Sequence, residues 1–434
     1  MIYKNSESPR RAKNLKYLRI SNRAEIIRCL SIQGPISRIE LASQLGLTKM
    51  AISSIVSEMI EEGLVLEQGT RASGDKSFAI LPGKIPEESA LSENLPEESV
   101  LSEKPSEESS NSPSAGAGRR PSMLAIHAEQ INALGLYLSR DAIEGVQCDV
   151  TGQIIRTWNH PLEEFTNADN YLTQMDEILD AMLLETAGVH VVGIGISSIG
   201  PLDMSAGRLL SPANFHGIHN LSLTNFVQRK CSFPVILDND MNAAVQAEQL
   251  YGTAKKYRHV VYLGIGNGIG AGVISYGRIF QGSSGVGGEL GHMSVNLDGP
   301  HCLCGNRGCL ELYASIPVLL RQSGSLNIRE MVNRAVSDPS SANVWLPRMM
   351  QALTTALVNI ANIFDPEIIL LGHQCIYLAP ILLPELENEV NRHIIQREIR
   401  HIPIRIAAFG EKTPLVGAAA LIFQAVFRGE IPVC

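Results

Sequence analysis

Apolar residues in the first part of the chain recur at helical spacing, and polar or glycine-containing turns interrupt them. This pattern predicts helices over residues 22–33, 37–46 and 48–62, followed by a short strand over 64–67 that would open a β-wing. A helix, a glycine-containing turn and a second helix are typical of a helix-turn-helix, whose second helix enters the major groove of DNA. We therefore expect an amino-terminal winged helix-turn-helix domain over residues 1–81.

Two hydroxyl side chains mark where the second and third helices begin. Ser37 with Glu40 three residues later forms a predicted capping box, and Thr48 caps the next helix. Polar or exposed positions away from the apolar face are the candidates for contact with DNA. Our predicted DNA-binding set is Ser37, Thr48, Lys49, Met50, Ser53, Ser54, Ser57, Arg119 and Arg120.

From Met123 onward the hydrophobic pattern alternates between strand-like and helix-like segments. We predict strands over 131–138, 143–150, 190–196, 234–238, 260–265, 271–276 and 367–371. Helices are predicted over 168–187, 241–251, 346–364 and 413–427. The mixture indicates an α/β body. Early strands separated by turns favour the ribonuclease-H-like half of an actin-like fold over a dinucleotide-binding fold.

Residues 82–117 have a different composition from both flanking regions. They contain a ten-residue Pro-Glu-Glu-Ser repeat and much Ser, Pro, Ala and Gly, with too little apolar surface to offset ordering entropy. We predict a disordered linker, or an insertion in the wing, that leads into a body over 118–434. Arg119 and Arg120 follow the linker, where they could enter a minor groove or simply form its basic end.

Charge and cysteine usage narrow the class further. The net charge is −8, yet residues 1–81 carry 12 basic and 8 acidic side chains, so the basic part is the amino terminus. A basic arm on an acidic protein favours nucleic-acid binding. We find no signal-peptide pattern and no long apolar run, and the scattered cysteines follow no disulfide framework. These features predict a cytoplasmic protein without membrane insertion.

Three cysteines and a histidine lie close together in the sequence between residues 292 and 309. His292, Cys302, Cys304 and Cys309 offer one imidazole and three thiolates, a set that suits tetrahedral Zn²⁺. His301 is a rival fourth ligand, and buried or redox-active thiols are the alternative to a metal site. Four ligands leave no open position, so the predicted zinc is structural.

A buried strand ending at Leu237 runs directly into Asn239 and Asp240. Ligands of open α/β sheets bind at the carboxyl ends of strands, where these side chains fall. Asp240 there would accept hydrogen bonds from a sugar hydroxyl or act as a general base, whereas a helix cap is the alternative role of the pair. The glycine-rich run over 263–272 lies between two strands, so it is not a dinucleotide fingerprint.

Taken together, these motifs resemble the ROK family of sugar kinases and sugar-responsive repressors. The most specific match is Gly288-Glu-Leu-Gly-His292 followed by Cys302-Leu-Cys-Gly-Asn-Arg-Gly-Cys309-Leu-Glu311. The resemblance implies zinc on the histidine and three cysteines. It also implies a sugar pocket lined by Asn214, Asn239, Asp240, Glu289, His292 and Glu311.

One departure from the family pattern separates its two branches. Family kinases open the body with Asp-x-Gly-Gly-Thr, whereas residues 133–142 here have neither the glycine pair nor the threonine, and Gly372 is followed by His373. Phosphoryl transfer depends on such positioning of phosphates. We therefore expect no enzymatic activity. The expected protein is a homodimeric or larger repressor that binds operator DNA and a small sugar.

Two other functions remain open at this point. The first is a ROK-type kinase that phosphorylates a hexose with ATP and carries an added DNA-binding domain. The second is a protein-interaction body that receives its signal from a sugar-transport protein.

Overall fold

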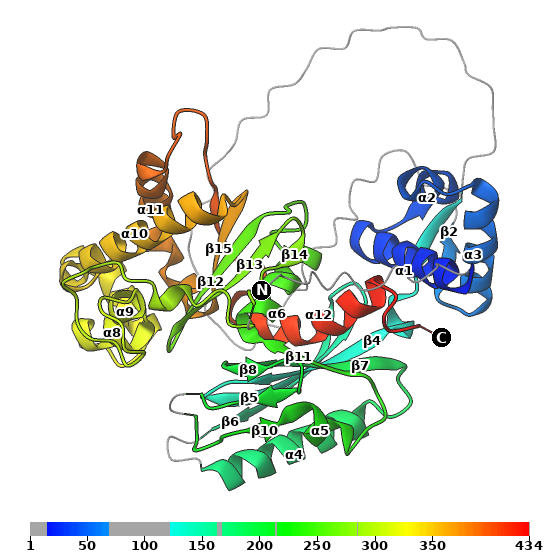
Figure 1. The fold of residues 1–434 in the computed structure, drawn as a ribbon, viewed down its shortest axis with the longest axis horizontal. Helices are drawn as coiled ribbons and strands as arrows, with labels where there is room; N and C mark the ends of the chain where they lie inside the picture. The colour runs from blue at the N-terminus through cyan, green and yellow to red at the C-terminus, as the bar shows by residue number, and fades with distance from the viewer. Residues whose placement is uncertain (1–14, 69–121, 163–166, 213–214, 284, 434) are drawn as a thin grey trace, which may run out of the picture.

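The computed structural model describes residues 15–68, 122–162, 167–212, 215–283 and 285–433 (Figure 1). It contains an amino-terminal module of three helices and a small sheet, followed by two α/β lobes. The predicted α/β class, winged helix-turn-helix and actin-like body are all confirmed. Among the described residues, no helix is both long and apolar enough to span a bilayer.

The amino-terminal helices form where the sequence places their caps. They are α1 (Leu15–Gln33), α2 (Arg38–Leu45) and α3 (Lys49–Glu61), and α1 begins seven residues before the predicted start. The capping box is present, because Ser37 Oγ accepts from the Glu40 amide at 3.2 Å and Glu40 accepts from the Ser37 amide at 2.9 Å. Ile39 of α2 is 55% exposed although its side chain is apolar.

The small sheet of this module consists of three antiparallel strands in the order β1-β3-β2. These strands are β1 (Ile36–Ser37), β2 (Val65–Gln68) and β3 (Met123–Ile126). The strands β2 and β3 pair directly, from Val65 opposite Ile126 to Gln68 opposite Met123. The predicted linker therefore lies between two paired strands of the wing, and β3 belongs to the amino-terminal sheet although it follows residue 118.

The first lobe is built on a five-stranded sheet in the order β11-β7-β4-β5-β6. Its strands are β4 (Asn132–Leu138), β5 (Ala142–Asp149), β6 (Ile154–Pro161), β7 (Val191–Ser198) and β11 (Val235–Asn239). The central strands β4 and β7 are buried along their whole length. Helices α4 (Ala168–Glu185) and α5 (Leu223–Gln228) lie beside this sheet, with the short strands β8 (Leu202–Asp203), β9 (Arg208–Leu209) and β10 (Leu221–Ser222).

The second lobe repeats the same strand arrangement. Its sheet has the order β14-β13-β12-β15-β16, with bounds β12 (Val260–Ile265), β13 (Ile269–Ser275), β14 (Arg278–Ile279), β15 (Ile368–Gly372) and β16 (Ile404–Ile406). In each sheet the first strand, β4 or β12, is central. On one side of it both strand pairings are parallel, and on the other side both pairings are antiparallel. This duplication of a ribonuclease-H-like unit defines the actin-like architecture.

Helices that the hydrophobic pattern did not predict cover the second lobe. Of its helices, α10 (Leu346–Phe364) was predicted with its observed bounds. The structure adds α7 (Glu311–Ala314), α8 (Ile316–Ser323), α9 (Ile328–Ser337) and α11 (Ala379–His393). Strands β6, β8 to β10, β14 and β16 and helix α5 were also missed, and most of these are short.

Two helices, α6 (Asp240–Leu250) and α12 (Thr413–Phe427), pack against each other at the centre of the molecule (Figure 1). Glycines allow this close packing. A Cβ on Gly417 would lie 2.5 Å from the Ala243 carbonyl group, and one on Gly195 of β7 would lie 1.8 Å from the Ala418 oxygen. Because α12 also contacts β4 and β7, it ties α6 to the first lobe.

The amino-terminal module shares its hydrophobic core with the body. One cluster contains Ile27 and Leu30 of α1 together with Phe423 and Phe427 of α12. The Arg23 guanidinium donates a hydrogen bond to the Val433 carbonyl at 3.1 Å. The amino-terminal module is therefore packed on the carboxy-terminal helix rather than tethered by the chain alone.

Candidate functional site

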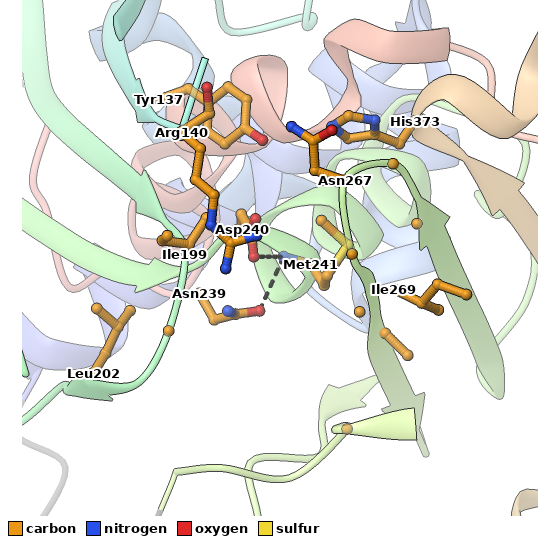
Figure 2. Close-up of a pocket in the computed structure, with 18 of the residues that line it drawn as sticks. Tyr137, Arg140, Ile199, Leu202, Asn239, Asp240, Met241, Asn267, Ile269 and His373 are labelled. Atoms are coloured by element: carbon orange, nitrogen blue, oxygen red, sulfur yellow. Dashed lines mark hydrogen bonds between the residues drawn. The ribbon is translucent and has the colours of Figure 1, made fainter. Parts of the chain in front are cut away.

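A cavity of about 670 Å³ lies between the two lobes (Figure 2). Its walls come from the β4–β5 turn, the end of β11, the β12–β13 hairpin and the segment that precedes α7. This position, at the carboxyl ends of the parallel strands, is where an open α/β sheet binds ligands. The cavity contains five of the six predicted sugar-binding residues: Asn239, Asp240, Glu289, His292 and Glu311. Asn214 lies outside the described residues.

Asn239 and Asp240 reach the cavity because β11 ends there and α6 begins. The Asn239 side chain caps α6, accepting hydrogen bonds from the amides of Met241 at 3.0 Å and Asn242 at 3.4 Å (Figure 2). Capping, one of the two roles considered for this pair, is therefore present in the structure. These bonds use the side-chain oxygen, so any hydrogen bond that Asn239 donates to a ligand comes from its amide nitrogen.

Asp240 is a buried carboxyl group that faces the cavity, with 8% of its surface exposed. Its pKa is raised to about 7, mainly by burial; the Met241 amide and the Arg140 guanidinium act to lower the pKa, and the Glu289 carboxylate acts to raise it. The Met241 amide donates to Asp240 Oδ1 at 2.9 Å. Asp240 therefore changes its ionisation state close to neutral pH.

Glu289, His292 and Glu311 line the opposite wall. Glu289 precedes a short 3₁₀ helix over Leu290–His292, His292 ends it, and Glu311 begins α7. Glu311 Oε2 accepts a hydrogen bond at 3.1 Å from the Ile269 amide in the β12–β13 hairpin. The arrangement places three carboxyl groups, those of Asp240, Glu289 and Glu311, around one cavity, where each can accept hydrogen bonds from hydroxyl groups.

The predicted metal ligands come together behind this wall. The ligand atoms of His292, Cys302, Cys304 and Cys309 all lie within 4.8 Å of one another. His292 Nδ1 lies 3.7 Å from Cys302 Sγ, and Cys304 Sγ lies 3.7 Å from Cys309 Sγ. Two thiolates bound tetrahedrally to Zn²⁺ with bonds of about 2.3 Å are roughly 3.8 Å apart, so the cluster fits this ion.

The rival ligand His301 is not in this group. Its Nε2 atom lies 2.6 Å from the Arg307 guanidinium, outside the four-residue cluster. His292 therefore completes the set, and it is also the residue shared between the metal cluster and the cavity wall. A metal bound here would hold the wall in place through His292 and supply no open coordination position.

On the amino-terminal module, most of the predicted DNA-binding side chains form one exposed surface. Met50 is 83% exposed at the start of α3. Thr48, Lys49, Ser53, Ser54 and Ser57 are exposed with it. The prediction that Ser37 contacts DNA is wrong, because Ser37 is 4% exposed and its hydroxyl group is held in the capping box with Glu40. Arg119 and Arg120 lie outside the described residues.

Arg140, Asp141 and Asn267 are among the cavity residues that were not predicted as site residues. Arg140 and Asp141 occupy the β4–β5 turn, and Asn267 occupies the β12–β13 turn. The Asn267 amide donates to Asp141 Oδ2 at 2.5 Å, which joins the two lobes across the cavity. The sequence did offer a signal for Arg140 and Asp141, because residues 133–142 depart from the family's phosphate loop. A changed loop at a site can place new side chains there.

Fold and cleft define a class: an actin-like body with a ligand cavity between its lobes, joined to a winged helix-turn-helix module. The chain belongs to the ROK family, whose model matches residues 138–425. It is 28% identical to a xylose repressor of Bacillus spizizenii over 399 residues, covering 90% of this chain and 91% of that protein.

Two further comparisons concern part of the chain and nearly all of it, respectively. A glucokinase of Thermotoga maritima is 30% identical over 268 residues, covering 57% of this chain and 84% of that protein. The crystal structure of a ROK family transcriptional regulator, described as a homologue of the Escherichia coli MLC protein, matches with a TM-score of 0.73. It is 22% identical and covers 95% of this chain and 97% of that one, which supports the fold of module and body together.

Proposed function

We propose that this protein is a sugar-responsive transcriptional repressor that binds operator DNA through α3 and a small sugar in the cavity between its lobes. The observation that carries the proposal is the shared core of α1 and α12, because it joins a DNA-binding module to the ligand-binding body. Full-length similarity to a xylose repressor supports the same function.

The cavity suits a neutral sugar. Asp240, Glu289 and Glu311 accept hydrogen bonds from hydroxyl groups, and Asn239 offers an amide donor beside them. Among the described residues that line the cavity, carboxyl groups outnumber Lys and Arg side chains six to two. A phosphorylated sugar would meet like charge, so the proposed effector is an unphosphorylated pentose or hexose.

The β4–β5 turn supports a non-enzymatic role for the body. A triphosphate that entered between the two turns would have to break the bond between Asp141 and Asn267 and meet the carboxyl groups of Asp141, Glu144 and Glu411. Burial lowers the pKa of His373 at the same end of the cavity, so its ring is neutral and offers no countercharge. We propose that the body transfers no phosphoryl group.

Zinc and self-association complete the proposal. His292, Cys302, Cys304 and Cys309 hold a structural Zn²⁺ that keeps the wall containing His292 in place. Two copies of the chain present two α3 helices to a palindromic operator, as symmetric readers of DNA do. Sugar binding changes the closure of the lobes, provided that the sugar prefers one closure state.

The test is fluorescence anisotropy of the full-length protein on DNA from its own upstream region, with and without D-xylose, D-glucose and N-acetyl-D-glucosamine. We expect salt-sensitive binding that one sugar releases, together with no ATP turnover in a coupled assay. Lys49→Ala should weaken binding and reduce its salt dependence. Sugar-dependent conversion of ATP to ADP with formation of a sugar phosphate, without specific DNA binding, would instead support the glucokinase-like alternative.

A further inference from the structure

The turn that joins β4 to β5, Ser139–Ala142, is held in one conformation by its own first residue. Ser139 Oγ accepts hydrogen bonds from the amides of Asp141 at 3.3 Å and Ala142 at 3.0 Å, and donates to the Ala142 carbonyl at 2.9 Å. The backbone of Arg140 is therefore fixed between two bonded residues. Both Arg140 and Asp141 line the cavity.

Aromatic side chains support this turn from inside the first lobe. His216 Nε2 donates to the Arg140 carbonyl at 2.9 Å, and its ring stacks on Tyr171 with centroids 5.3 Å apart. Phe215 packs edge-on against Tyr171 at 5.1 Å, and both of these rings are buried. A turn anchored on buried rings presents its side chains in a fixed direction, which recognition of a small ligand requires.

The Arg140 side chain extends from this turn toward Asp240 (Figure 2). Its positive charge lowers the pKa of Asp240, so the two groups act on each other across the space that both line. Ionised carboxylates accept hydrogen bonds and donate none, whereas a guanidinium donates up to about five. A sugar between these walls needs both kinds of partner, because each hydroxyl group donates one hydrogen and offers two lone pairs.

We propose that Arg140 is a specificity-determining residue for the effector, donating hydrogen bonds to one oxygen of a neutral sugar whose hydroxyl groups donate to Asp240. This inference rests on the proposed sugar-binding function. It assigns the first-lobe side of the cavity to direct recognition of the sugar. Asp141 of the same turn joins the lobes through Asn267, so the sugar contact and the contact between lobes lie on adjacent residues.

The experiment is calorimetric titration of the full-length protein with D-xylose, D-glucose and N-acetyl-D-glucosamine, and with each monodeoxy analogue of the one that binds. Arg140→Gln and Arg140→Lys are compared with wild type and with Arg156→Gln, which removes an arginine paired with Glu185 on the outside of the same lobe. We expect Arg140→Gln to weaken binding of the parent sugar about tenfold or more, since a hydrogen bond to a charged group is lost.

The analogues separate a direct contact from a structural role. In wild type, the analogue that lacks the oxygen bound by Arg140 should bind about tenfold more weakly than the parent sugar. In Arg140→Gln this analogue and the parent should bind equally, while discrimination against the other analogues is kept. Arg140→Lys should be intermediate, because an ammonium lacks the paired N–H groups of a guanidinium.

Equal weakening of the parent and every analogue would overturn the inference and assign Arg140 to the folding of the turn. Unchanged affinity in Arg140→Gln, with the melting temperature of the wild type, would overturn it as well. If wild type bound no sugar, both the inference and the proposed function would fall. Loss of discrimination between the parent sugar and one analogue, confined to the Arg140 variants, would support both the inference and the proposed function.

Discussion

Asp240 lines the cavity and has a pKa near neutral pH, so its ionisation would link pH to binding of the proposed sugar. Its pKa is about 7 in the folded protein, mainly because the carboxyl group is buried, whereas an unfolded chain has a value near 3.9. The folded state therefore holds this proton more tightly than the unfolded state. The contribution of Asp240 to stability is full below about pH 4 and is lost progressively as the pH rises through 7.

Replacing Asp240 with asparagine should remove this pH dependence. Relative to wild type, Asp240→Asn should gain in melting temperature between pH 5 and pH 8, because no buried charge forms. Sugar affinity of the wild type should rise about tenfold from pH 6 to pH 8, since the ionised form accepts the hydroxyl hydrogens. The variant should bind weakly at every pH. Scanning and titration calorimetry at four pH values would measure the melting temperature and the sugar affinity of both proteins. Parallel pH profiles for wild type and Asp240→Asn would contradict the assignment.

The metal site offers a second test at the scale of single residues. Cys304 is exposed, so Cys304→Ser disturbs little packing while it removes one of four ligands. We expect zinc content to fall from about one ion per chain to well below one, with a lower melting temperature. Cys231→Ser, outside the cluster, is the matched control. Equal zinc in both variants would show that the cluster is not the site.

At the scale of elements, two hairpin turns meet across the cavity through Asp141 and Asn267. One belongs to the first lobe and the other to the second, so their hydrogen bond favours the closed arrangement of the lobes. Removing this hydrogen bond should raise the free energy of the closed arrangement relative to the open one by about 1 kcal/mol, the net contribution of one such bond.

We therefore expect Asn267→Ala to weaken sugar binding about fivefold, because the sugar must then supply the free energy of closure. The sugar-free variant should also show a larger radius of gyration in small-angle X-ray scattering, a difference that saturating sugar removes. Asn170→Ala, at the outer start of α4, is the control. Identical scattering profiles for wild type and Asn267→Ala would exclude a role for this bond in closure.

Local pattern predicted most of the long elements, but it missed the 15-residue helix α11 and most of the short elements that their surroundings define. Helix α10 has one apolar face over many residues and α12 is apolar on nearly all sides, so their bounds were predicted as observed. Strands such as β14 and β16 have two or three residues, and they are strands only because a neighbour pairs with them. Apolar character alone would place Ile39 in the core, yet α2 exposes it.

The candidate site was predicted to a similar extent. Cysteine spacing and the strand end at Asn239 are local features, and both led to residues that the fold brings to the cavity or the metal cluster. Arg140 and Asn267 are separated by more than a hundred positions and take part because two lobes face each other. Sequence spacing carries no information on that juxtaposition. Ser37 was wrongly predicted to contact DNA, because its hydroxyl group is bonded to Glu40 in the capping box.

At the scale of the whole molecule, the wing contains an unusually long connection. Residues 69–122 join β2 to β3, although those strands pair as a hairpin. Closing a long loop costs more entropy than closing a short one, with a logarithmic dependence on length. The pairing of β2 with β3 must overcome this entropy in every folding event.

Deleting residues 82–117 should therefore stabilise the protein by about 1 kcal/mol, the difference in closure entropy between the two loop lengths. Urea denaturation of wild type and the deletion variant would measure it, and replacement by a Gly/Ser segment of equal length is the control. A loss of stability on deletion, absent from the replacement, would show that the length is needed for strand pairing.

The central position of α12 has a consequence for biosynthesis. Residues 413–427 follow the other helices and strands of the structure in the sequence, yet they pack on α1, α6, β4 and β7. A nascent chain on the ribosome consequently holds its amino-terminal module and its first lobe with apolar faces uncovered until this segment emerges. Contacts between the two ends of a chain form slowly, so newly made protein should depend on chaperones more than its lobes would separately.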